Sequence, residues 1–115
     1  MHEIVHGVTI KAINNTSNKF ERKFAKSNAV MYKMANEAFQ KFIGLHNSDL
    51  GMYALTNKDE FAAEFITNET ARSTIYGLAE MLDSQNRSKF ITALKNFIND
   101  IVHLFVNVDV FKTNV

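Results

Sequence analysis

Residues 84–105 read SQNRSKFITALKNFINDIVHLF, and the apolar side chains in this stretch recur every three or four positions. That spacing collects them on one face of an α-helix, because about 3.6 residues complete one turn. The face consists of Phe90, Ile91, Leu94, Phe97, Ile98, Ile101 and Leu104. Since such a face must be buried against another element, the stretch predicts a helix that begins at Ser84 and forms part of a helical core.

The same periodicity predicts helices over most of the remaining chain. One long helix is expected over 18–43, with a possible break at Ser27-Asn28, and another over 2–13. Two more helices are expected between Asn57 and Leu82, the second capped by Thr67 or Asn68. The absence of Pro and the presence of only 4 Gly favour uninterrupted helices.

We therefore predict a single, mostly α-helical domain over residues 1–115, with about five helices. The stretch FVNVDVF (105–111) alternates apolar and polar residues, which allows a short C-terminal strand. The run KFERKFAK (19–26) is short and basic, and we interpret it as a solvated helix face.

Composition excludes several classes of function. The net charge of +1 gives no electrostatic basis for binding nucleic acid or a membrane surface, so neither partner is expected. No apolar run is long enough for a membrane span and no signal-peptide pattern is present, so a cytoplasmic location is favoured. Because the chain has no cysteine, any bound metal must be held by His, Asp and Glu.

A candidate metal site begins at the sequence HEIVH (2–6). On a helix, His2 and His6 lie four residues apart and share one face. Zinc accepts such a pair, and a catalytic site then needs a third protein ligand and a water molecule. Glu3 stands where a carboxylate can take a proton from that water. Two histidines near the start of a chain also occur by chance, so the third ligand decides the interpretation.

The third ligand must come from elsewhere in the chain. A metzincin motif would have Gly and His at the positions of Thr9 and Ala12, and is excluded. The better candidates are Glu60 and Glu64, which are four apart among apolar neighbours on the helix that starts near Asn57. One carboxylate could ligate zinc while the other holds a ligating imidazole; the alternative is that both are solvated on an outer face.

The two segments together resemble the glutamate-ligand zincins, or gluzincin metallopeptidases, of the lethal-factor-like and phage polyvalent-protein kind. The family pattern Tyr-x-x-x-Asn-x-x-Glu-Phe-x-Ala-Glu is matched from Tyr53 through Glu64. The resemblance implies zinc as cofactor, His2, His6 and Glu60 as ligands, and Glu3 as general base. It further implies that Glu64 supports a ligating histidine and that Tyr53 donates a hydrogen bond to the oxyanion, in a reaction that hydrolyses a peptide or protein substrate.

The resemblance also implies a missing half. In gluzincins the His-Glu-x-x-His helix begins several residues before its first histidine and follows a β-sheet, whereas Met1 alone precedes His2 here. We therefore expect these residues to be the C-terminal helical half of a zincin-like metallopeptidase, whose activity at this length is left open. The alternative is a non-catalytic helical interaction module derived from a phage or mobile element, and exposed apolar faces would then favour a homodimer.

Overall fold

The computed structural model describes residues 2–42, 55 and 57–107, and these residues form five α-helices and no strand. The predicted helical class and the approximate number of helices are confirmed. The helices are α1 (His2–Asn14), α2 (Lys19–Phe42), α4 (Lys58–Thr67), α5 (Glu69–Met81) and α6 (Ser84–Val106). None of the helices in this part of the chain combines the length and apolar composition that crossing a bilayer requires.

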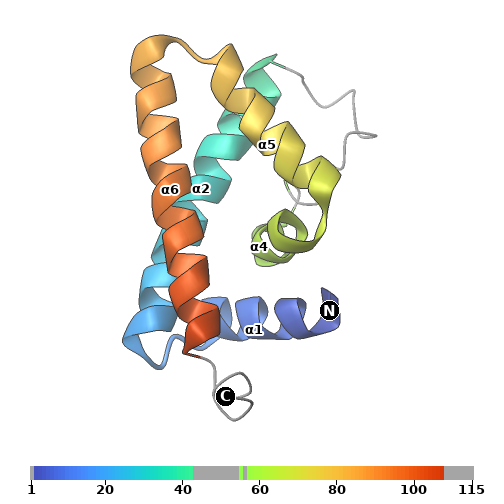
Figure 1. Ribbon diagram of the computed structural model, residues 1–115, viewed down its shortest axis with the longest axis vertical. Helices are drawn as coiled ribbons and strands as arrows, with labels where there is room; N and C mark the ends of the chain where they lie inside the picture. Colours follow the sequence, from blue (N-terminus) through green and yellow to red (C-terminus); the bar gives the residue numbers. More distant parts are fainter. Residues whose placement is uncertain (1, 43–54, 56, 108–115) are drawn as a thin grey trace.

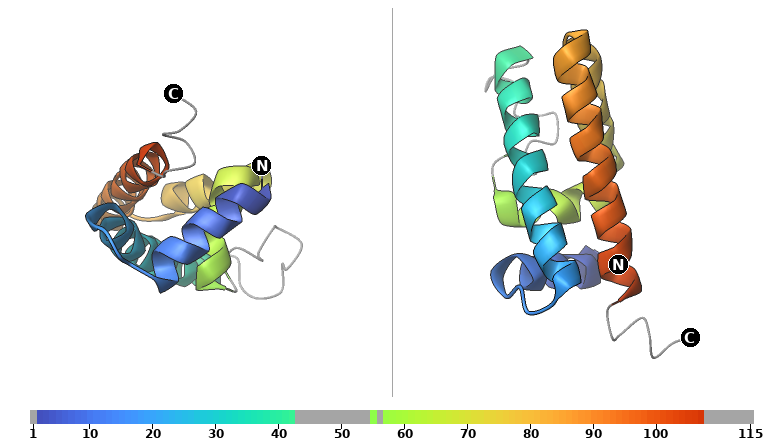
Figure 2. Two further views of the ribbon diagram at one scale, coloured as in Figure 1. Left: turned by 90° about the horizontal axis from the view of Figure 1, so that it is seen from below. Right: turned by 90° about the vertical axis from the view of Figure 1, so that its left-hand side faces the viewer.

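The two longest helices, α2 and α6, lie side by side and antiparallel along the long axis of the molecule (Figure 1). Helix α1 crosses the end at which α2 begins and α6 finishes (Figure 2). Helix α4 packs on α1, and α5 leads from α4 back to the start of α6. Two helices distant in sequence, α1 and α4, therefore meet at one end of the bundle.

The centre of the core is aromatic. The ring of Phe97 on α6 lies 6.2 Å from that of Phe24 on α2, measured between centroids. It also lies 5.5 Å from Phe61 and 5.3 Å from Phe65, both on α4. All four rings are buried. Aromatic pairs at such distances add about 0.5–1.5 kcal/mol beyond their burial, so this cluster helps to hold α4 against α2 and α6.

Asn side chains set the limits of α4 and α5. Asn57 is the N-cap of α4, and its side chain accepts a hydrogen bond from the Asp59 amide. Asn68 is both the C-cap of α4 and the N-cap of α5, and its side chain accepts from the amides of Thr70 and Ala71. Of the two caps considered from the sequence for α5, Asn68 is therefore the one used.

Three details differ from the sequence-based expectation. Helix α2 is continuous through Ser27 and Asn28, so the break considered possible there is absent. Asn28 is fully buried rather than placed at a kink. The run 19–26 exposes its basic side chains as expected, but Glu21 within it is only 4% exposed. The first two residues of 105–111 continue α6, and those after Asn107 lie outside the described residues.

Candidate metal centre

The crossing of α1 over α4 is built from small side chains. On α1, Val5, Thr9 and Ala12 are buried, and on α4 both Ala62 and Ala63 have no exposed surface. Small side chains let two helix backbones approach closely, as expected for the alanines of α4. Thr9 and Ala12 are thus fully buried side chains of α1.

This crossing brings His6 and Glu60 together although 54 residues separate them in the chain. The Nε2 atom of His6 lies 2.5 Å from Oε1 of Glu60. The Glu60 side chain is 14% exposed and that of His6 is 33% exposed. Glu60 is therefore not solvated on an outer face. Of the two alternatives considered from the sequence, the structure shows the paired carboxylate, and its partner is His6.

The contact involves the atoms that would ligate a metal. Zinc binds histidine nitrogen at about 2.0–2.1 Å and carboxylate oxygen at about 2.0–2.2 Å, so two tetrahedral ligands lie roughly 3.4 Å apart. The 2.5 Å separation of His6 and Glu60 would have to grow by about 1 Å to admit an ion between them. Rotation about the long Glu60 side chain can supply such a change, and these two residues fit a zinc site.

The structure does not show where the side chains of the third predicted ligand, His2, and of the predicted oxyanion donor, Tyr53, lie relative to this pair. His2 is the first residue of α1, one turn before His6, but its side chain is not described, and Tyr53 lies outside the described residues. Within the described part of the chain, no three His, Asp or Glu side chains gather as a metal-binding group. Ligation by His2 and a hydrogen bond from Tyr53 stay predictions.

Glu64 lies one turn after Glu60 on α4, and its side chain contacts the joint between α4 and α5. Its Oε2 accepts a hydrogen bond from Nδ2 of Asn68 at 3.1 Å. The Asn68 amide also donates to the main-chain oxygen of Glu64 at 2.8 Å. The structure thus gives Glu64 a role in the end of α4, and its predicted support of a ligating histidine is not tested by this contact.

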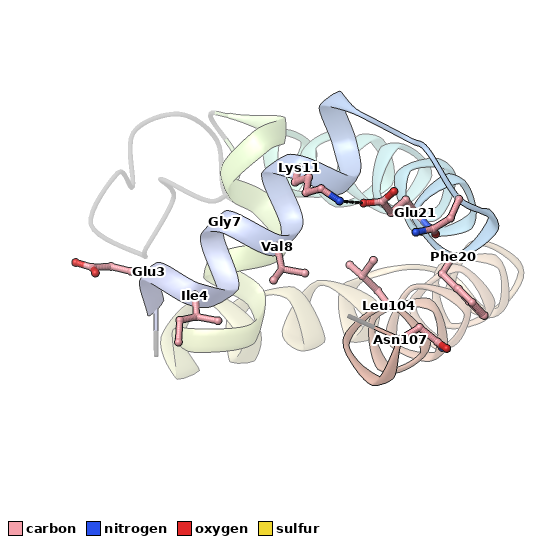
Figure 3. Close-up of a pocket in the computed structure, with 10 residues that line it drawn as sticks. Glu3, Ile4, Gly7, Val8, Lys11, Phe20, Glu21, Leu104 and Asn107 are labelled. Atoms are coloured by element: carbon pink, nitrogen blue, oxygen red, sulfur yellow. Dashed lines mark hydrogen bonds and ion pairs between the residues drawn. The ribbon is translucent and has the colours of Figure 1, made fainter. Parts of the chain in front are cut away.

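Glu3, the predicted general base, is exposed in the first turn of α1. In Figure 3 its side chain extends away from the ion pair at the other end of the same helix. That pair joins Nζ of Lys11 to Oε2 of Glu21 at 3.0 Å. An exposed carboxylate is free to change rotamer, so a water-activating role for Glu3 is compatible with this position.

An open groove of about 460 Å³ runs along α1 (Figure 3). Ile4 and Val8 of α1 and Leu104 of α6 are among the residues that line it. Ile4 and Val8 each lie two positions from His6, and residues two positions apart in a helix point about 200° apart. Both side chains therefore face away from the side of α1 that carries His6. His6 and Glu60 do not line the groove, whereas Glu3, the predicted general base, does.

The structure adds three residues to the surroundings of Glu60 that were not identified from the sequence. Asn28, Tyr32 and Asn36 of α2 each donate a side-chain hydrogen bond to a main-chain carbonyl at or just before the start of α4. Their spacing of four residues is visible in the sequence as a polar row beside the apolar positions Met31 and Ala35. Their partners are backbone atoms, which leave no sequence signal.

Comparison with protein-family models, with curated proteins and with solved structures finds no match for this chain. A functional interpretation therefore depends on the residues themselves and on the geometry described above.

Proposed function

We propose that this chain carries the zinc-binding part of a gluzincin-type metallopeptidase site. One observation carries the proposal: Nε2 of His6 and Oε1 of Glu60 lie within 2.5 Å, on helices that meet through buried small residues. A coincidental His-Glu-x-x-His sequence would have no reason to lie beside a carboxylate that comes 54 residues later. A partly buried carboxylate is costly unless it is paired or ligates a metal, and both outcomes are open to Glu60 beside His6.

In this proposal His2, His6 and Glu60 hold the zinc ion. When bound, zinc would polarise the substrate carbonyl and lower the pKa of its water to roughly 7. Glu3 would take a proton from the attacking water and return it to the leaving amine. The water oxygen would bond to the carbonyl carbon as the C–N bond breaks, which leaves a carboxylate and an amine. Tyr53 donates its hydroxyl hydrogen bond to the oxyanion that forms on the attacked carbonyl.

Isothermal titration calorimetry with zinc tests the ligand set. The parent chain should bind one zinc ion with micromolar or tighter affinity, and Glu60→Gln should bind at least about tenfold more weakly because an amide is a poorer ligand than a carboxylate. Glu37→Gln removes the same charge from an exposed position of α2 and should bind as the parent does. Equal affinities of the parent and Glu60→Gln, or no binding by the parent, would contradict the proposal.

Hydrolysis is tested separately, on a mixed peptide library with the zinc-loaded parent and Glu3→Gln. If the proposed roles are correct, the parent cleaves peptides and Glu3→Gln retains zinc but loses most of the rate, since general acid–base catalysis contributes roughly 10²–10⁴-fold. Retained cleavage by Glu3→Gln would exclude Glu3 as the base. Zinc binding without cleavage by the parent would restrict the proposal to metal binding.

A second candidate function is a non-catalytic interaction module, with a second copy of this chain as the partner. Its supporting observation is the exposure of large apolar side chains near the end of the bundle: Ile4 is 51% exposed, Val102 52% and Val106 62%. Sedimentation equilibrium of the parent and of Ile4→Lys and Val106→Lys tests it. A dimer that the lysine variants dissociate supports this function, and a monomer at every concentration opposes it.

A further inference from the structure

A row of polar side chains on α2 faces the segment that leads into α4. Asn28, Tyr32 and Asn36 are four residues apart and therefore lie one above another on the same face of the helix. Their neighbours Met31 and Ala35 are fully buried, so the row borders the hydrophobic core. We call these three residues the α2 row.

The α2 row binds the main chain at two points. Nδ2 of Asn36 donates to the carbonyl oxygen of Leu55 at 2.7 Å, and the hydroxyl of Tyr32 donates to the same oxygen at 3.2 Å. Nδ2 of Asn28 donates to the carbonyl oxygen of Lys58 at 3.5 Å, a long and therefore weak hydrogen bond. The carbonyl groups before and at the first residue of α4 are thus tied to α2.

These ties lie next to the candidate zinc ligand. Lys58 is the first residue of α4, and Glu60 follows two positions later in the same turn. The Tyr32 ring also contacts the ring of Phe61 edge-on, with centroids 5.6 Å apart. Helix α2 therefore holds the first turn of α4 through hydrogen bonds to the main chain and through the Tyr32–Phe61 ring contact. Helix α1 contributes His6, which contacts Glu60.

Stability alone does not account for Asn28 in the α2 row. Asn28 has no exposed surface, and its Oδ1 has no hydrogen-bond partner among the described residues. A buried amide with an unsatisfied oxygen costs free energy that an apolar residue at the same site would not. The position in which Asn28 holds the carbonyl group of Lys58 therefore explains this residue better than the strength of the hydrogen bond does.

We propose that Asn28, Tyr32 and Asn36 are positioning residues that hold the first turn of α4 so that the Glu60 carboxylate meets His6 and the metal. This inference rests on the proposed function, since it adds positioning residues to the same zinc site. Residues that orient metal ligands typically change metal affinity by 10–100-fold when they are replaced.

Two conservative substitutions test the row without opening the core. Tyr32→Phe removes only the hydroxyl and keeps the ring on Phe61. Asn36→Asp keeps the shape and the oxygen that accepts from Gln40, but replaces the NH₂ donor by an acceptor. The matched controls are Tyr76→Phe and Asn99→Asp, which make the same chemical changes at exposed positions of α5 and α6.

Two measurements are made on each variant. The first is zinc affinity by calorimetry, where the double variant Tyr32→Phe/Asn36→Asp should be 10–100-fold weaker than the parent. The second is the imidazole ¹⁵N chemical shift of His6 at one fixed pH without zinc, which reports its contact with Glu60. We expect this shift to change in both row variants and in neither control.

A merely structural role gives a different result. If the row variants melt at lower temperature but keep the parent's zinc affinity and His6 ¹⁵N shift, the inference is overturned. If the parent binds no zinc, the proposed function fails, and the His6 shift alone then decides whether the row positions Glu60. Unchanged His6 shifts in both row variants would refute the positioning role in either case.

Discussion

Glu21 carries a carboxylate that the fold both buries and satisfies. Its Oε1 accepts hydrogen bonds from the amide and the hydroxyl of Ser17, at 3.1 and 2.7 Å, and its Oε2 accepts from Nζ of Lys11. Its own amide donates to the side chain of Asn18. Burial by itself raises the pKa of Glu21, but the hydrogen bonds from Ser17 and Lys11 outweigh it and the pKa lies below its ordinary value of 4.5.

The direction of that shift predicts how stability depends on pH. A carboxyl group with a lowered pKa in the folded state adds stability that is complete above its ordinary pKa and is lost as pH falls through the folded pKa. Glu21→Gln should therefore lower the free energy of unfolding by about 2 kcal/mol at pH 7, as hydrogen bonds to charged groups stabilise by about 1.5–3 kcal/mol. The difference from the parent should narrow below pH 4.5.

Urea unfolding of both proteins at pH 7 and pH 3 measures this difference. Glu37→Gln, at an exposed position of α2, should show little difference from the parent at either pH. A Glu21→Gln penalty of the same size at both pH values would mean that shape, and not charge, accounts for the role of Glu21.

Among the helices, α4 and α5 meet at a joint where one side chain, Asn68, contacts both helices. Asn68 caps α5 and also donates to the Glu64 carboxylate on α4. Asn68→Ala should lower the free energy of unfolding by about 1 kcal/mol, the usual cost of losing an N-cap. Asn68→Ser keeps a cap acceptor but cannot reach Glu64, so it should retain most of that stability. Chemical denaturation compares the two, and equal losses would show that the bond to Glu64 matters more than the cap.

The packing of α1 on α4 gives a prediction that links stability to the proposed zinc site. Ala63 is fully buried in α4, whereas Ala29 on α2 is exposed. Ala63→Leu should cost about 1–3 kcal/mol through overpacking and should also weaken zinc binding, because it enlarges a side chain beside the helix that carries His6. Ala29→Leu should change neither. Thermal melts measure the stability of these variants, and calorimetry measures their zinc affinity. If Ala63→Leu is destabilised but keeps the parent's zinc affinity, packing at this position does not affect the proposed zinc site.

The elements also show which parts of the fold could be predicted from sequence. Helical periodicity identified the five helices of the described residues, because a repeating apolar face is a strong signal. It failed at Ser27-Asn28, where residues of low helix propensity lie inside α2 because Asn28 packs against α4. The chemistry of the motif left Glu60 and Glu64 as alternative partners of the histidines, and the resemblance to gluzincins implied Glu60 as the ligand. The α2 row was not predicted because it binds backbone carbonyls, whose positions depend on the tertiary fold.

At the scale of the whole molecule, a bound zinc ion would join elements from both halves of the chain. His6 belongs to α1 and Glu60 to α4, and α4 packs in turn on α2 and α5. A ligand that binds the folded state alone adds stability, about 2.7 kcal/mol at a concentration 100 times its dissociation constant. One kcal/mol shifts the melting temperature of a domain near this size by about 4 °C or more.

Saturating zinc should therefore raise the melting temperature of the parent by roughly 10 °C, as followed by circular dichroism. Glu60→Gln should show a much smaller rise at the same zinc concentration, because one ligand is lost. Magnesium should have little effect on either protein, since it prefers oxygen ligands and retains its water. An equal rise in the parent and in Glu60→Gln would place the bound zinc at other side chains, and a zinc-induced fall would mean that the metal prefers the unfolded chain.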